Sequence, residues 1–91
     1  EIYNRRRSRI STPELNIFLK DLNLSFSSPS SRGRVSRMSY CVQAGTEPPT
    51  IIFFTSRPRG IPKQYNRFLD RKLRESFDFL GTPLRIIFKH K

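Results

Sequence analysis

The sequence predicts an α+β fold in which two helices pack on one face of a mixed three-stranded sheet. Apolar residues recur at helical spacing in two segments, three short runs have strand-like composition, and Gly or Pro separates most of these elements. The resulting order is helix, strand, strand, helix, strand. Because a strand-helix-strand crossover is almost always right-handed, we expect the third strand to run parallel to the second.

The first helix is expected over about 11–23, because a capping box marks its start. The Ser11 hydroxyl can accept a hydrogen bond from the Glu14 amide while the Glu14 carboxylate reaches back, and Pro13 is tolerated in the first turn. Ile17 lies off the apolar stripe, and the pattern gives it no role. The stripe itself consists of Leu15, Phe18, Leu19 and Leu22.

The strands follow from alternation and β-branched composition. The Ser-rich segment 25–33 reads as a loop, 34–43 as the first strand, 44–49 as a turn, 50–55 as the second strand and 84–88 as the third. The first two strands are expected to form a hairpin. Within the first strand the predicted faces are Val35 and Cys41 on one side, and Met38, Tyr40 and Val42 on the other.

The second helix is expected to begin near Pro62 and to run to about Leu80, with Gly81 as a left-handed C-terminal cap. Its predicted core stripe is Ile61, Tyr65, Phe68, Leu69, Leu73, Phe77 and Leu80. Two exposed ion pairs at four-residue spacing are expected on its outer face, Arg71 with Glu75 and Arg74 with Asp78.

The sequence lacks the residue constellations of an enzyme. It has no convincing carboxylate pair, nucleophile beside a base, metal-ligand spacing or phosphate-binding glycine loop. We interpret the single Cys41 as a buried small hydrophobe and His90 as solvated. One cysteine cannot form an internal disulfide, and no apolar run could cross a membrane. We therefore expect a cytoplasmic binding module that has no cofactor, metal or small-molecule substrate of its own.

Charge is the strongest functional signal, because 18 Lys and Arg against seven Asp and Glu give a net charge of +11. Such an excess repels itself unless a polyanion offsets it, so we expect structured RNA as the partner. Arg57 and Arg59 precede the second helix, and Lys63 and Arg67 lie in its first turns, where exposed amides favour an anion. We predict that these four form one phosphate-facing patch; the alternative is a solvated charged loop.

Two further arginine clusters could contact phosphates. Arg34 and Arg37, with Arg32 beside them, enter the first strand and are also candidate RNA-binding residues. Arg5, Arg6, Arg7 and Arg9 either contact RNA nonspecifically or belong to a linker. The strand aromatics could serve as base-stacking platforms, but in so small a domain we interpret them as core: Tyr40, Phe53 and Phe54.

Six segments stand in consistent order over about 9–89: Arg9-Ile-Ser-Thr-Pro-Glu-Leu-Asn16, Tyr40-Cys-Val-Gln43, Pro48-Pro-Thr50, Tyr65-Asn-Arg-Phe-Leu69, Leu73-Arg-Glu-Ser-Phe77 and Gly81-Thr-Pro83. Together they resemble the C-terminal KH-like domain of the Der (EngA) family of bacterial GTPases. The resemblance implies a KH-like α-β-β-α-β domain at 10–91, preceded at 1–9 by a basic linker from a GTPase domain. It also implies a parent protein that acts in large ribosomal subunit assembly, whose two tandem GTPase domains bind GTP and Mg²⁺ and are absent here.

The sequence departs from typical KH domains at one place. Those domains clamp the nucleic-acid backbone with a Gly-x-x-Gly loop, whereas the corresponding segment 57–60 has one Gly and two Arg. This favours backbone or shape contact with folded ribosomal RNA. Two functions stay open: a module that docks on ribosomal RNA, and a protein-interaction module that packs against the GTPase domains and relays their nucleotide state. A role at a membrane surface is least favoured, because the basic residues share no helix with an exposed apolar stripe.

Overall fold

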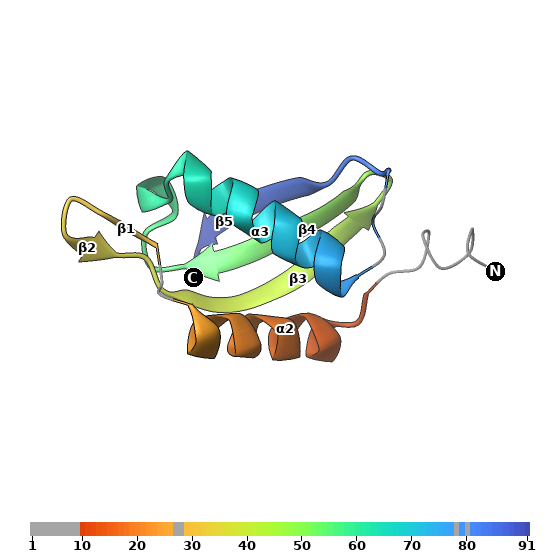
Figure 1. Ribbon diagram of the computed structural model, residues 1–91, viewed down its shortest axis with the longest axis horizontal. Helices are drawn as coiled ribbons and strands as arrows, with labels where there is room; N and C mark the ends of the chain where they lie inside the picture. Colours follow the sequence, from red (N-terminus) through yellow and green to blue (C-terminus); the bar gives the residue numbers. More distant parts are fainter. Residues whose placement is uncertain (1–9, 27–28, 78, 80) are drawn as a thin grey trace.

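The computed structural model describes residues 10–26, 29–77, 79 and 81–91. Strands β3, β4 and β5 form one sheet in that order, with β3 antiparallel and β5 parallel to β4, and both helices pack on one face of it (Figure 1). The predicted fold class and order are therefore confirmed, with an additional two-stranded hairpin, β1–β2. The elements are α2 (Thr12–Ser25), β1 (Ser30–Ser31), β2 (Arg34–Val35), β3 (Met38–Thr46), β4 (Pro49–Thr55), the 3-10 helix η1 (Pro58–Gly60), α3 (Lys63–Ser76) and β5 (Arg85–His90).

The start of α2 has the predicted capping box. The Glu14 amide donates to Ser11 Oγ at 3.3 Å, and the Ser11 amide donates to Glu14 Oε1 at 3.4 Å. The helix extends two residues beyond the expected end, to Ser25, where Phe26 turns to extended backbone and its amide bonds the Leu22 carbonyl. The predicted stripe is the buried face: Leu15, Phe18, Leu19 and Leu22.

Replacing Ser11 with Ala should lower the free energy of unfolding by about 1 kcal/mol, because the Glu14 amide loses its side-chain acceptor. Urea denaturation measures the change. Ser25→Ala, at the exposed other end of the same helix, is the control and should stay within about 0.5 kcal/mol of the parent chain. Equal effects of the two substitutions would contradict a capping role for Ser11.

The prediction of one strand over 34–43 was wrong at its beginning. Arg34–Val35 pairs with Ser30–Ser31 across a two-residue turn in which Arg32 and Gly33 both have positive φ, 54° and 77°. Two such residues give a turn whose twist matches a hairpin, and β3 itself begins only at Met38.

The predicted faces of this segment also need correction. Pairing with β4 shifts register between Met38 and Tyr40, because these two residues face Thr55 and Phe54, which are adjacent in β4. Because of this shift, Met38 lies on the helix-covered face, where it is buried with Cys41, instead of sharing a face with Tyr40. Tyr40 lies on the opposite face.

The end of α3 was predicted four residues too late. The helix ends at Ser76, where Phe77 adopts extended backbone and its amide donates to the Leu73 carbonyl at 2.8 Å. Phe77 then packs against Phe18, with ring centroids 5.7 Å apart, and the chain continues to the buried Phe79. This aromatic packing competes with helix continuation. Gly81 has the expected positive φ of 74°, but in the turn after the helix; Leu80 lies outside the described residues.

The ion pairs on α3 also differ from those predicted. Arg74 Nε lies 2.7 Å from Asp70 Oδ1, and Lys72 Nζ lies 3.4 Å from Glu75 Oε1. Glu75 therefore pairs with Lys72 rather than Arg71, whose guanidinium lies 5.8 Å from the Phe68 ring centroid. The predicted partner of Arg74, Asp78, lies outside the described residues.

The outer edge of β3 is bonded by side chains of α2. Asn16 Nδ2 donates to the Cys41 carbonyl at 2.9 Å, and its Oδ1 accepts from the Cys41 amide at 3.0 Å. Seven residues further along α2, Asn23 Nδ2 donates to the Met38 carbonyl at 3.1 Å. These bonds fix α2 along the sheet edge and supply partners to backbone groups that have no neighbouring strand.

The interpretation of Cys41 as a buried hydrophobe is confirmed, because its side chain is fully buried and burial raises the pKa of its thiol from 9.0 to about 12. Since the unfolded chain loses this proton first, the contribution to stability is complete below pH 9 and disappears as pH rises toward 12. No helix among the described residues is long and apolar enough to span a membrane.

At pH 8 the Cys41 thiol should react with a disulfide reagent about a thousandfold more slowly in the folded chain than in urea, because the thiolate fraction falls with the raised pKa. Absorbance of the released thiol measures both rates. Similar rates in the two conditions would contradict a buried Cys41.

Candidate nucleic-acid interface

The candidate phosphate-binding residues gather at one end of the molecule, where β4 and β5 finish (Figure 1). The Ser56 amide donates to the Arg37 carbonyl at 3.3 Å, and the Arg37 amide donates to Ser56 Oγ at 3.2 Å. On the other side of β4, the Lys91 amide donates to the Thr55 carbonyl at 3.2 Å. We call this region the basic end; its cations are Arg34, Arg37, Arg57, Arg59, Lys63, Arg67 and Lys91.

Arg57 links the β1–β2 hairpin to η1. Its Nη1 donates to the Arg34 carbonyl at 3.2 Å, and its own carbonyl accepts from Ser36 Oγ at 3.0 Å. A Cβ on Gly60 would lie 3.1 Å from both Arg57 Nη1 and Ser36 Oγ, so glycine permits this close packing. Arg57 thus joins the β1–β2 hairpin, through the Arg34 carbonyl and Ser36, to the start of η1.

The other five predicted site residues are exposed: Arg34, Arg37, Arg59, Lys63 and Arg67. Across the described part of the chain, none of these five has an acidic side chain within ion-pair distance. The acids Asp70 and Glu75 are paired in the second half of α3. Positive charge in the first half is therefore not locally offset.

The N-terminus of α3 adds backbone donors to this surface. Pro62 is the N-cap, makes no side-chain capping bond, and is followed by a first turn without an acid. The first amides of a helix lack intrahelical partners and carry the positive end of the helix dipole. Lys63 and Arg67 lie in the first two turns of the same helix. Their charges and the unpaired amides together favour binding of an anion at this end of α3.

A hollow of about 480 Å³ opens at the basic end, lined by Arg57, Pro58, Arg59, Gly60 and His90. His90 is exposed, as interpreted from the sequence. Sequence reasoning missed that His90 and Lys91 join this region. The signal that could have found them was the expected parallel pairing of the third strand with the second. β5 extends two residues beyond the predicted end, and this extension brings His90 and Lys91 beside Thr55 and η1.

The strand aromatics divide between the two faces of the sheet. Phe53 is fully buried, as predicted. Tyr40 is 45% exposed and Phe54 half-buried on the face away from the helices, with ring centroids 6.0 Å apart. Core placement was therefore wrong for Tyr40 and Phe54, because the register of β3 with β4 pairs them on that face.

The match to known proteins agrees with this architecture. Residues 9–89 match the family model described as the KH-domain-like, C-terminal domain of EngA bacterial GTPase enzymes. The chain belongs to this family. The predicted resemblance to the Der (EngA) KH-like domain is thus confirmed.

Relatives in this family are named GTPase Der. The chain is 42% identical over 81 residues to that of Geobacter metallireducens, an alignment covering 89% of this chain and 18% of the relative. It is 42% identical over 90 residues to that of Gemmatimonas aurantiaca, covering 99% of this chain and 21% of the relative. With the Flavobacterium johnsoniae protein, identity is 30% over 91 residues, again 21% of the relative. The chain spans about a fifth of the length of these relatives.

Proposed function

We propose that this chain is the RNA-binding, regulatory C-terminal domain of a tandem-domain GTPase that acts in large ribosomal subunit assembly in the bacterial cytoplasm. The observation that carries the proposal is the gathering of exposed cations at the basic end, five of which have no acidic partner within the described residues. Ribosomal RNA is the proposed partner. GTP and Mg²⁺ would bind the GTPase domains, and this chain would need no cofactor.

The contact would be made to RNA backbone rather than to bases. Arg59, Lys63 and Arg67 lie on η1 and the start of α3, and the free amides of that helix add donors for phosphate oxygens. Arg57 is bonded to the hairpin, so the position of the surface is fixed before RNA binds. A preorganised, charged surface without a Gly-x-x-Gly loop suits recognition of folded RNA by shape.

The test is binding of the 91-residue chain to folded large-subunit ribosomal RNA fragments across a salt series. With about five phosphate contacts, the logarithm of the association constant should fall with the logarithm of salt with a slope of about −4. A single-stranded homopolymer of equal length is the matched competitor and should bind more weakly. Absence of binding at low salt, or equal affinity for the homopolymer, would contradict shape recognition of ribosomal RNA.

A second candidate function is packing against the GTPase domains to relay their nucleotide state. The face of the sheet away from the helices favours it, because an exposed Tyr40 and a half-buried Phe54 form an aromatic pair there. Hydrogen exchange in the whole protein, compared between GDP and a GTP analogue, would distinguish the two functions. Nucleotide-dependent protection of β3 and β4 favours the relay; protection at the basic end only on adding RNA favours RNA binding.

A further inference from the structure

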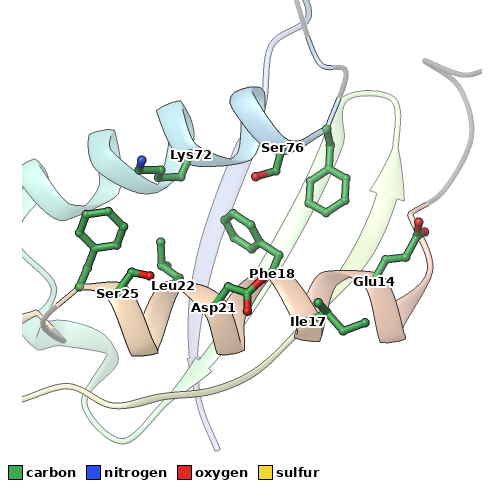
Figure 2. A pocket seen from close by; sticks show the side chains of 10 residues that line it. Glu14, Ile17, Phe18, Asp21, Leu22, Ser25, Lys72 and Ser76 are labelled. Carbon is green, nitrogen blue, oxygen red and sulfur yellow. The ribbon is translucent and has the colours of Figure 1, made fainter.

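A groove runs between α2 and α3 on the side of the helices away from the sheet (Figure 2). Its volume is about 400 Å³, and Phe18, Leu22 and Phe77 give it an apolar lining. Two large apolar side chains also line it while remaining exposed, Ile17 of α2 at 61% and the C-cap residue Phe26 at 43%. Ile17, which lies off the core stripe, therefore has a place in this groove.

Aromatic contacts bridge the helices at both ends of the groove. Phe18 and Phe77 meet edge to face with centroids 5.7 Å apart, and Phe26 and Phe68 do so at 5.0 Å. Lys72 Nζ, from α3, lies 4.9 Å from the Phe26 ring centroid. Large rings in these positions hold the two helices apart, and the groove lies between them.

The charge at this groove is opposite to that of the rest of the molecule. Glu14 and Asp21 line the α2 side, and both are exposed (Figure 2). Among the described residues, no cation lies within ion-pair distance of Asp21. Among the described residues that line the groove, Lys72 is the one cation, and it is engaged with Glu75 and with the Phe26 ring. On a chain of net charge +11, this acidic side disfavours phosphate and favours cationic groups.

We propose that the groove between α2 and α3 binds a basic amphipathic helix of a partner protein, whose apolar side chains enter between Ile17 and Phe26 while its Lys or Arg residues meet Asp21 and Glu14. Ile17 and Phe26 are nine positions apart, about 13 Å along a helix, which corresponds to two to three turns of a helix lying in the groove. Apolar anchors three and four residues apart are how helices dock in such grooves. The groove and the basic end are separate surfaces, so the proposal goes beyond RNA binding and does not depend on it.

The first experiment compares two synthetic amphipathic peptides of about 18 residues, with the same Leu-rich face and either Lys or Glu on the polar face. Fluorescence anisotropy with the 91-residue chain measures both affinities. The Lys peptide should bind at least about tenfold more tightly, because its charges meet Asp21 and Glu14. The net charge of +11 by itself predicts the reverse order. Stronger binding of the Glu peptide, or no binding of either peptide, would overturn the proposal.

Matched variants test whether the peptide binds in this groove. Ile17→Ser should weaken Lys-peptide binding by about tenfold, whereas Leu24→Ser should change it by less than about twofold, since Leu24 is 78% exposed on the same helix but lines a different hollow. Asp21→Lys should weaken binding by about fivefold relative to Leu24→Lys. Equal effects of the Ile17 and Leu24 substitutions would overturn the placement.

Two controls separate this proposal from other readings. Ile17→Ser should leave the affinity for ribosomal RNA unchanged, so failure of either proposal can be recognised independently of the other. Sedimentation of the 91-residue chain should show a monomer. A dimer that Ile17→Ser dissociates would instead assign the groove to a second copy of the chain and overturn the proposed partner.

Discussion

Replacing Arg59, Lys63 and Arg67 together with Ala is expected to weaken binding to ribosomal RNA about a hundredfold and to reduce the salt slope by about two to three. All three side chains are exposed, and none has an acidic partner in the described part of the chain. Their removal should therefore cost phosphate contacts without breaking internal ones. Filter binding or anisotropy across a salt series measures both quantities.

The matched control removes three cations elsewhere, Lys20, Arg71 and Arg85, all of them exposed and none part of the basic end. The two triple variants have the same net charge, so a general electrostatic effect would weaken both equally. Equal loss would mean that RNA contacts are spread over the surface. Arg57 is left out of the test variant because its bond to the Arg34 carbonyl holds the hairpin in place.

Replacing Asn16 with Ala is expected to lower the free energy of unfolding by about 2–3 kcal/mol, because the amide and carbonyl of Cys41 both lose their partner. In a domain of this size the melting temperature should fall by roughly 10–15 °C. Thermal and urea denaturation measure the change. The loss exceeds that of Ser11→Ala, since two backbone groups at the contact between helix and sheet become unsatisfied instead of one exposed amide.

Two neighbouring substitutions test the explanation for Asn16. Asn23→Ala removes a single bond to the Met38 carbonyl and should cost about 1 kcal/mol. Asn16→Asp keeps an acceptor for the Cys41 amide but loses the donor to its carbonyl, so its cost should be intermediate. If Asn16→Ala costs no more than Asn23→Ala, water replaces the side chain at Cys41.

Features set by a few neighbouring residues could be predicted from the sequence. The start of α2 is an example, because its capping box is contained in Ser11 to Glu14. The end of α3 could not be predicted, because Phe77 leaves the helix to meet Phe18, a residue far away in the chain. The shift between Met38 and Tyr40 likewise comes from pairing with β4.

The same distinction applies to the two proposed surfaces. The places of Lys63 and Arg67 in the first turns of α3, and of Arg59 just before that helix, could be predicted from the sequence. The bond from Arg57 to the Arg34 carbonyl and the arrival of Lys91 beside Thr55 depend on tertiary structure. The groove beside Ile17 needed both helices in place, so the sequence showed only an apolar residue off its stripe.

The bonds from Asn16 and Asn23 to β3 also affect how copies of this domain behave at high local concentration. An open strand edge invites another chain to extend the sheet, which leads to aggregation. Here side-chain amides already occupy the Cys41 and Met38 groups along one border, and the opposite border, β5, includes Arg85, Lys89 and His90. Crowded copies of the domain should therefore stay discrete instead of joining through their sheets.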